Sequence, residues 1–354
     1  MNKNNNLILD ETFALAVLNH GKNNLLVAKN LYNEVLKIDP NNIAALNNLG
    51  GVLNQLKEYQ NSVNSYEKII EINPNYESAY INLGIVFNNI GDFQKSITCY
   101  EKAIEINPSS TDAHYNLGNV YKILKKYQKA ITCYEKAIEI NPKYVNAYNN
   151  LSITFYEIGD LQKAISFCEK AIEINPNPDA FNNLGTMLNG IKKDQKAISS
   201  YEKAIEINPN FTDAYYNLGK IYDMLGHTQK AEVYYKKTIE INPNYLRAHF
   251  NLGNICINEA KYEKAKDYYE KVIELDPGHV DAYGNLGAVF SALKQFQKAK
   301  NCYEKAKNID PTNKVNKIGY GKVLLRLNEH AKGLKSINEG HGVIEFTQSD
   351  FKII

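Results

Sequence analysis

Histidine and cysteine are the side chains in this sequence that could bind a metal ion or attack a substrate, and the chain has seven and five of them. His114 and His249 fall at the same place in a helical pattern that tyrosines fill elsewhere, so we interpret them as core residues. Cys99, Cys133 and Cys302 share another place and read as small buried hydrophobes. No metal-ligand spacing, G-x-S-x-G, glycine-rich phosphate loop or H-E-x-x-H occurs. Paired carboxylates are frequent but fall on solvated faces. We therefore expect no enzyme activity, no cofactor and no metal site.

Asparagine is the residue type whose spacing does indicate a chemistry, namely hydrogen bonding. In eight consecutive segments an asparagine precedes the leucine of a Leu-Gly or Leu-Ser pair, and we call these the ladder asparagines: Asn48, Asn82, Asn116, Asn150, Asn183, Asn217, Asn251 and Asn285. An amide offers one acceptor and two donors. A row of amides can therefore pair with both the N–H and C=O groups of an extended polypeptide. Alternatively, these positions are merely solvated in a sequence that is rich in Asn, Lys and Ile.

Other side chains are expected beside the ladder asparagines. Four aromatic residues would offer apolar or stacking surface to a ligand: Tyr115, Tyr156, Tyr216 and Phe250. Aspartates recur four residues before several ladder asparagines, and basic residues are scattered among them. Such a mixed surface suits a polypeptide better than a polyanion. We therefore predict a protein or peptide partner that binds in extended conformation.

Regularly spaced prolines reveal the elements that must position these side chains. Pro40, Pro74, Pro108, Pro142 and Pro176 lie 34 residues apart, Pro209 follows after 33, and the 34-residue spacing then continues to Pro311. Within residues 111–142 the apolar side chains form two helical stripes separated by a polar turn. Proline pushes the residue before it out of the helical region and so ends each second helix. Each unit is thus a helix, a turn and a helix, which can bury its stripes only by stacking on its neighbours.

Small residues recur in both helices of the unit. Glycine is found in the first helix at Gly50, Gly84, Gly118, Gly185, Gly219, Gly253 and Gly287, and alanine in the second at Ala130, Ala164, Ala197, Ala231, Ala265 and Ala299. A glycine inside a helix costs about 1 kcal/mol relative to alanine. Because this cost recurs, we expect the two helices to cross closely at the Gly/Ala pair, with the ring of Tyr134 and its equivalents filling the space beside it.

The order Leu-Gly, aromatic, Ala, Tyr, Ala, Pro at this period resembles the tetratricopeptide repeat. The resemblance covers nine units over residues 9–311, with Ser152 replacing the glycine, Ser62 and Ser96 replacing the alanine, and Ala16 replacing the first glycine. It implies an all-α fold, a right-handed superhelix (α-solenoid) whose first helices line the inner, concave surface. Residues 312–337 are expected to form a degenerate repeat, a C-terminal capping helix pair. We expect residues 1–8 to be a disordered N-terminal tail and residues 338–354 an extended C-terminal tail.

The ladder asparagines also resemble the asparagine row of O-GlcNAc-transferase-type repeats, which holds substrate polypeptide. The main hypothesis is a non-catalytic scaffold that binds an extended segment of a partner protein in its concave groove. The alternative is the substrate-recruiting arm of a glycosyltransferase, or of another modifying enzyme, whose catalytic domain is absent from this chain. No Lys or Arg replaces a ladder asparagine, so the carboxylate clamp of chaperone-binding repeats is not matched.

Composition narrows the remaining function classes. The 41 basic and 39 acidic residues are intermixed and give a net charge of +2, which favours neither nucleic acid nor an anionic membrane surface as partner. No apolar run is long enough for a membrane span, and the odd number of cysteines argues against a disulfide framework. We therefore expect a cytoplasmic protein. The C-terminal tail, with Gly340 and Gly342, reads either as a short strand or hairpin covering the last helix or as a linker.

Overall fold

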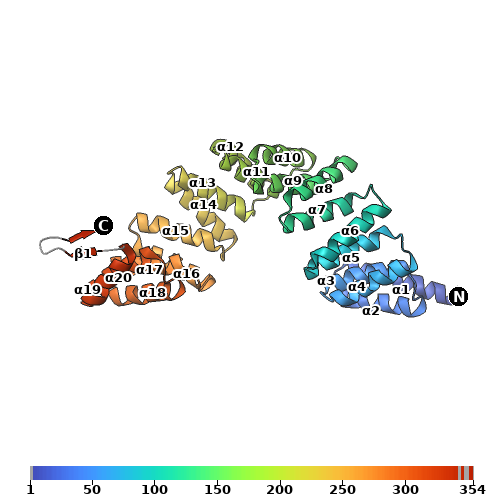
Figure 1. Ribbon diagram of the computed structural model, residues 1–354, viewed down its shortest axis with the longest axis horizontal. Coiled ribbons are helices and arrows are strands. Elements are labelled where there is room, and N and C mark those ends of the chain that lie inside the picture. The colour runs from blue at the N-terminus through green and yellow to red at the C-terminus, as the bar shows by residue number, and fades with distance from the viewer. Residues whose placement is uncertain (1–2, 342–343, 347–350, 354) are drawn as a thin grey trace. The chain divides into compact units, whose positions relative to one another are not determined.

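The computed structural model describes residues 3–341, 344–346 and 351–353, and these residues form twenty helices and two short strands (Figure 1). The helices follow one another as ten antiparallel pairs, which confirms the predicted all-α solenoid of stacked helix pairs. The first helices of the pairs are α1 (Lys3–Gly21), α3 (Ile43–Gln55), α5 (Glu77–Ile90), α7 (Thr111–Ile123), α9 (Val145–Glu157), α11 (Pro178–Gly190), α13 (Thr212–Met224), α15 (Leu246–Asn258), α17 (Val280–Ala292) and α19 (Lys314–Arg326).

The second helices begin after a short turn and contact the first helix of their own pair most extensively. They are α2 (Leu25–Ile38), α4 (Tyr59–Ile72), α6 (Phe93–Ile106), α8 (Tyr127–Ile140), α10 (Leu161–Ile174), α12 (Asp194–Ile207), α14 (Thr228–Ile241), α16 (Tyr262–Leu275), α18 (Phe296–Ile309) and α20 (His330–His341). Strands β1 (Ile344–Phe346) and β2 (Phe351–Ile353) pair in antiparallel fashion.

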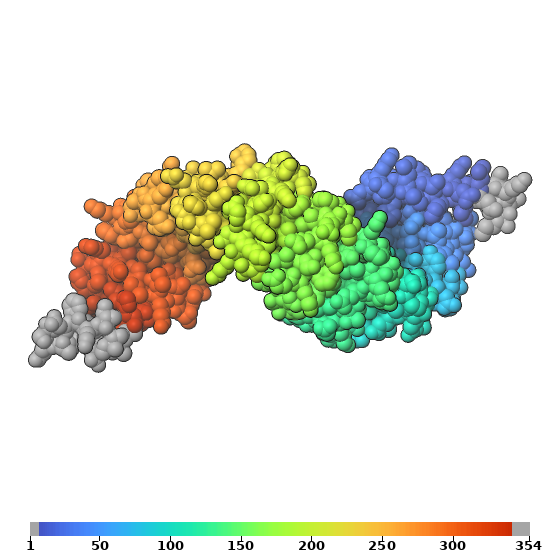
Figure 2. All heavy atoms as spheres, turned by 90° about the horizontal axis from the view of Figure 1, so that it is seen from above, coloured from blue at the N-terminus to red at the C-terminus, as the bar shows by residue number. Residues whose placement is uncertain are grey.

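The helix pairs group into two compact units, Met1–Pro176 and Asn177–Ile354, of five pairs each. The space-filling view shows successive pairs within each unit in contact, in chain order (Figure 2). The boundary falls where the 34-residue spacing shortens to 33. There Asn177 caps α11 by accepting a hydrogen bond of 2.9 Å from the Ala180 N–H, and Pro178 opens the helix. Proline is well suited to this first position because its missing N–H would have no helical partner there.

A glycine–tyrosine contact joins the two helices of most pairs. The ring of Tyr134 lies so close over Gly118 that a Cβ atom placed on the glycine would be 2.6 Å from the ring. The same contact recurs at Gly50, Gly84, Gly185, Gly219, Gly253 and Gly287, each with the tyrosine sixteen residues later. This confirms the expected close crossing, and it explains why seven pairs tolerate a residue that weakens an isolated helix.

Serine replaces the alanine at the helix crossing in two pairs. Ser62 and Ser96 stand where most second helices have alanine, and their hydroxyls donate hydrogen bonds of 2.7 and 2.8 Å to the main-chain oxygens of Gly50 and Gly84. A hydroxyl is tolerated in these buried places because it finds an acceptor on the facing helix.

Neighbouring pairs stack through a small residue near the start of each first helix. This alanine is buried in eight pairs, at Ala45, Ala79, Ala113, Ala147, Ala180, Ala214, Ala248 and Ala282. In the last pair Asn316 takes its place and is also buried, its side chain lying against Gly284. Successive first helices from α1 to α9 touch one another as well, as do α11 with α13 and α17 with α19. The first helices α1 to α9 therefore form a continuous surface in the first unit.

The turn inside every pair contains one residue with positive φ. Three of these are glycines, and the others include Lys125 with φ 55° and Ala260 with φ 56°. Residues other than glycine adopt this left-handed backbone conformation at a free-energy cost of about 1 kcal/mol or more. The helical periodicity alone did not indicate this constraint.

Both ends of the chain differ from the expectations. The predicted disordered tail over residues 1–8 is wrong for its described part, because α1 begins at Lys3. Extension of an existing helix costs far less than nucleation, so the helix anchored by buried Ala16 continues outward although Leu7 and Ile8 are exposed. At the other end α20 reaches His341, beyond residue 337, whereas the antiparallel strands β1 and β2 agree with the strand or hairpin that was one interpretation of this tail. Gly321 and Gly333 cross in this last pair, with Ile337 packed beside them in the place of the tyrosine.

Candidate functional site

The ladder asparagines lie on the first helices of eight pairs, from Asn48 on α3 to Asn285 on α17, and all eight are half-buried. Each directly precedes a buried leucine, such as Leu117 after Asn116. One residue is about 100° around a helix, so an asparagine in this place lies at the edge of the buried stripe. We call the side of the first helices that carries them the first-helix surface.

Three of the ladder asparagines, Asn82, Asn150 and Asn217, bond to the residue that precedes the ladder asparagine of the pair before, and for two of them this residue is another asparagine. The Nδ2 atom of Asn82 donates to Asn47 Oδ1 at 3.0 Å, and that of Asn217 donates to Asn182 Oδ1 at 2.8 Å. These bonds join α5 to α3 and α13 to α11. The variable position before the ladder therefore supplies acceptors that tie consecutive pairs together.

A second arrangement links the ladder to the core. Asn150 donates to Asn119 Oδ1 at 2.7 Å and to the Tyr115 hydroxyl at 3.1 Å, and Asn119 also accepts a 2.9 Å bond from the core hydroxyl of Tyr134. A similar network recurs four pairs later, where Asn285 donates to Asn254 and Tyr269 donates to Asn254, but the second acceptor of Asn285 is the core hydroxyl of Tyr269 itself. Sequence reasoning missed Asn119 and Asn254, although both stand three residues after a ladder asparagine.

Asn116 and Asn183 make no side-chain hydrogen bond within the described part of the chain, in contrast to Asn150. Asn82, Asn150, Asn217 and Asn285 use their Nδ2 donors inside the protein. Their carbonyl oxygens accept no bond among the described contacts. The first-helix surface thus offers amide acceptors whose orientation is fixed by the donor end of the same side chain.

The four aromatic residues expected beside the ladder do not share one environment. Tyr115, Tyr216 and Phe250 are half-buried, and each packs against the residue just before the next first helix: Tyr144 at 5.3 Å, Tyr245 at 5.1 Å and His279 at 5.0 Å between ring centroids. They contact the core tyrosine of their own pair as well. Tyr156 differs in being 39 % exposed.

The aspartates before the ladder form a further link between pairs. The Tyr144 hydroxyl donates a 2.8 Å bond to Asp112, and the Tyr245 hydroxyl donates a 2.8 Å bond to Asp213. Burial, assisted by the neighbouring aspartate, raises the pKa of both tyrosines. These hydroxyls therefore stay protonated and remain donors across the ordinary pH range.

The histidines and cysteines singled out by the sequence are held in packing positions. His114 and His249 bond through Nε2 to the carbonyl oxygens of Pro108 and Pro243, at 3.1 and 2.9 Å. Burial raises the pKa of the Cys99 thiol to about 12 and that of Cys133 to about 11, which disfavours the reactive thiolate. Within residues 3–341, 344–346 and 351–353, no group of three His, Cys, Asp or Glu side chains could hold a metal ion. No described helix is both long and apolar enough to cross a membrane.

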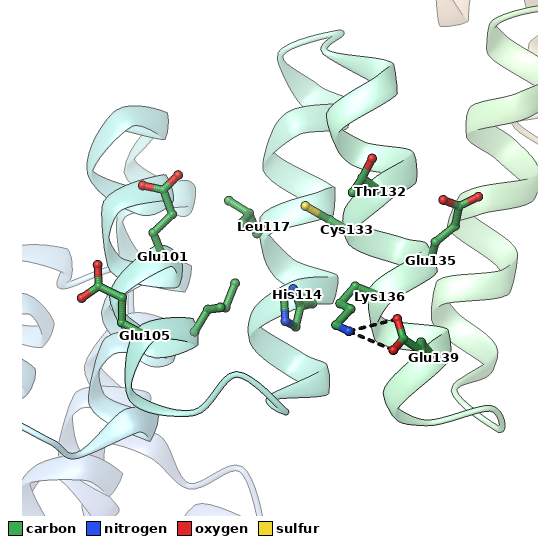
Figure 3. Close-up of a pocket in the computed structure, with 10 residues that line it drawn as sticks. Glu101, Glu105, His114, Leu117, Thr132, Cys133, Glu135, Lys136 and Glu139 are labelled. Atoms are coloured by element: carbon green, nitrogen blue, oxygen red, sulfur yellow. Dashed lines mark hydrogen bonds and ion pairs between the residues drawn. The ribbon is translucent and has the colours of Figure 1, made fainter.

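A groove lies on the other side of the first unit, between the second helices α6 and α8, with a volume of about 770 Å³ (Figure 3). Leu117 and His114 of α7 lie between the two second helices. Ile104 of α6 and Cys133 of α8 also line the groove. The remaining lining residues are four glutamates, one threonine and one lysine: Glu101, Glu105, Glu135, Glu139, Thr132 and Lys136. We call this cavity the α6–α8 groove.

Comparison with protein families gives one consistent result. Models described as tetratricopeptide repeat match residues 43–76, 65–98, 111–144, 133–166, 212–245, 246–279 and 280–313. A model described as TPR repeat matches residues 87–124 and 192–226. The matches together span residues 43–166 and 192–313, well over half of the chain. A search of curated proteins found no match.

One solved structure shows the same kind of fold. A tetratricopeptide repeat protein from Parabacteroides merdae ATCC 43184 is 20 % identical, with 70 % of this chain and 99 % of that chain covered at a TM-score of 0.54. Two crystal structures of MamA are 30 % and 29 % identical, cover 46 % and 47 % of this chain and 95 % and 92 % of their own, and have TM-scores of 0.42. The resemblance to O-GlcNAc-transferase-type proteins gains no support from these matches.

Proposed function

Because the chain belongs to the tetratricopeptide-repeat proteins, we propose that it is a non-catalytic scaffold that binds an extended segment of a partner protein along its first-helix surface. The observation that carries the proposal is the recurrence of a half-buried asparagine in eight consecutive pairs. A partner strand laid across several pairs would meet a chemically uniform row of amides. Contacts to the peptide backbone are independent of sequence, so the more variable side chains beside the row would set the specificity.

The hydrogen bonds inside the chain favour a particular mode of binding. Where the Nδ2 atom is used within the protein, as in Asn82 and Asn150, the amide is held in one orientation before any partner arrives. A side chain that is already ordered loses less conformational entropy when it binds. We infer that these amides accept from partner N–H groups, while Asn116 and Asn183 are free to donate and accept.

The test uses Asn116 and Asn183, whose replacement removes no described hydrogen bond within the chain. Wild type and the Asn116→Ala/Asn183→Ala double variant are compared by affinity capture and quantitative mass spectrometry. The proposal expects the same helicity and melting temperature for both proteins and a lower yield of specific partners for the variant. Asn33→Ala/Asn308→Ala is the matched control, because these exposed asparagines lie on second helices of the two units and make no side-chain hydrogen bond among the described contacts.

A captured partner then allows a direct test of backbone recognition. Its binding segment is made as a synthetic peptide with successive N-methyl groups, which remove single N–H donors. Binding through the amide row predicts large losses on methylation at regular intervals and smaller losses in a side-chain alanine scan. Equal capture by wild type and the double variant would count against the proposal, as would a segment that binds as a helix.

A further inference from the structure

The α6–α8 groove remains open because its second-helix residue is small. In the repeat, this place is taken in turn by Ser65, Cys99, Cys133, Phe167, Ser200, Tyr234, Tyr268 and Cys302. Phe167 stacks on Phe155 with centroids 5.5 Å apart and planes 3° apart, and it also contacts Tyr148, the counterpart of His114. A large ring therefore occupies the space that Cys133 leaves empty.

The same groove recurs one pair earlier. A smaller cavity of about 390 Å³ is lined by Tyr80, Thr98, Cys99, Glu101, Lys102 and Glu105. Apart from Glu101 and Glu105, which line both cavities, these residues stand 34 positions before His114, Thr132, Cys133 and Lys136 of the α6–α8 groove. The second helices of the first unit thus present two successive openings that share a cysteine, a threonine, a lysine and glutamates, and Leu117 and Ile104 form the aliphatic floor of the larger one.

The rim keeps a net negative charge after its own ion pairs are counted. Lys102 bonds to Glu105 at 2.7 Å and Lys136 bonds to Glu139 at 2.9 Å, each within one helix. Glu101 and Glu135 form no ion pair within the described residues, and both are exposed. A bound segment that covers the apolar floor would exclude water from around these two carboxylates. A positive charge on that segment would then be attracted to them more strongly.

We propose that the α6–α8 groove is a second docking surface, which takes a cationic segment of a partner protein. A large apolar side chain of that segment would fill the space above Leu117, Ile104 and Cys133, and flanking lysines or arginines would face Glu101 and Glu135. The volume lies within the range of about 300–1,000 Å³ typical of ligand sites. This surface is separate from the ladder asparagines and does not depend on the function proposed for them.

The decisive variant is Cys133→Phe, because the chain already accepts phenylalanine at the equivalent Phe167. Tyr121 stands where Phe155 supports that ring, so the new side chain has a stacking partner and the variant should fold. The probes are short fluorescein-labelled peptides composed of lysine and leucine, glutamate and leucine, lysine and serine, or serine and leucine. Binding is followed by fluorescence anisotropy, and the Leu117 and Ile104 methyl signals locate it by NMR.

The lysine–leucine peptide should bind tightest and shift both methyl signals. Cys133→Phe should abolish this binding, and Glu101→Gln/Glu135→Gln should weaken it roughly three- to tenfold and reduce its salt dependence. Two control variants should leave the binding of the lysine–leucine peptide unchanged. Glu169→Gln removes the equivalent carboxylate on α10, where Phe167 replaces the small residue of the groove. Asn116→Ala alters the first-helix surface. Equal binding of the glutamate–leucine peptide, retention of binding by Cys133→Phe, or no binding of any probe at millimolar concentration would each overturn the proposal.

Discussion

The hydroxyl of Ser152 donates a 2.7 Å hydrogen bond to the main-chain oxygen of Ala164, across the crossing of α9 and α10. Ser152 stands where seven other pairs have a glycine beneath a tyrosine ring. The residue at the tyrosine position of this pair is Cys168, which is buried. The two departures from the repeat therefore occur together. The first pair combines Ala16 with the buried ring of Tyr32, so we attribute the missing ring to the hydroxyl of Ser152 and not to the presence of a Cβ atom.

Replacing both residues should restore the contact that the other pairs use. Cys168→Tyr alone should destabilise by about 1–3 kcal/mol because its ring meets the Ser152 side chain. Ser152→Gly alone should cost about 1–2 kcal/mol through the lost hydrogen bond and the added helix entropy. The double variant should be more stable than the sum of these effects predicts. Urea unfolding of all four proteins measures the coupling, and simple additivity would contradict it.

Two adjacent glycines on α3 should respond to alanine in opposite directions. A Cβ atom on Gly50 would lie 2.6 Å from the Tyr66 ring, whereas one on Gly51 would have its nearest neighbour at 3.8 Å. Gly51→Ala should therefore stabilise by up to about 1 kcal/mol, the difference in helix propensity. Gly50→Ala should destabilise by about 1–3 kcal/mol through overpacking. Thermal melts of the two variants under the same conditions make the comparison, and a shift of the same sign in both would refute it.

The ladder asparagines should differ in their contribution to stability. Asn150→Ala removes two hydrogen bonds that join neighbouring pairs and should cost about 1–2 kcal/mol. Asn116→Ala breaks no described bond and should change the free energy of unfolding by less than about 0.5 kcal/mol. Chemical denaturation measures both effects. Equal losses in the two variants would show that the hydrogen bonds of Asn150 do not contribute to the free energy of unfolding.

The turn residues predict a stabilising substitution. Ala260 has a φ of 56°, a conformation that glycine adopts without steric cost. Ala260→Gly should stabilise by about 0.5–1 kcal/mol after allowance for the greater entropy of glycine in the unfolded chain. Gly91→Ala, at φ 88°, tests the converse and should destabilise. Melting temperatures of both variants decide the matter, and a loss of stability in Ala260→Gly would contradict the strain argument.

The core tyrosines should make the fold sensitive to alkali. Burial raises the pKa of Tyr303 to about 12, and burial also raises the pKa values of Tyr66, Tyr100, Tyr134 and Tyr269. An unfolded tyrosine titrates near pH 10. The contribution of these protonated tyrosines to the free energy of unfolding is therefore complete below about pH 10. It is lost as pH rises toward the folded-state pKa, at about 1.4 kcal/mol per pH unit for each such tyrosine.

The alkaline effect is measured from urea midpoints between neutral and strongly alkaline pH. Tyr303→Phe removes one titrating group, so the urea midpoint of this variant should fall less steeply with rising pH than that of the wild type. A phenylalanine ring keeps the packing against Gly287, which separates the proton effect from a loss of contact. Parallel declines in the two proteins would show that Tyr303 does not carry the effect.

The fold was largely predictable because its determinants are local. The apolar stripe that contains Leu117 and Gly118 repeats within one helix, and the proline that ends each second helix lies within one period. The glycine–tyrosine contact joins residues only sixteen apart. Only the start of α1, residues 3–8, was assigned to a disordered tail, because most of these residues are polar, although outward extension from a packed helix needs no apolar stripe.

The surroundings of the candidate site were less predictable because they depend on how the pairs stack. The acceptors for Asn150 come from residues 31 and 35 positions earlier, and helical periodicity does not indicate whether such side chains meet. The α6–α8 groove was missed for a related reason. Its opening follows from the absence of a large side chain at Cys133, which becomes visible only when the equivalent Phe167 is seen to stack on its own pair.

The seven glycine–tyrosine contacts between residues sixteen apart lie inside single helix pairs, whereas the bonds donated by the ladder asparagines run between pairs. A genetic crossover between the identical nonapeptides at residues 100–108 and 134–142 would delete a whole helix pair and leave every remaining glycine with its tyrosine. The cost would fall on Asn150, whose two partners lie in the lost segment and would be replaced by Ile81 and Ile85. The number of repeats can therefore change by whole helix pairs, and the hydrogen bonds between pairs are the contacts that such a change disrupts.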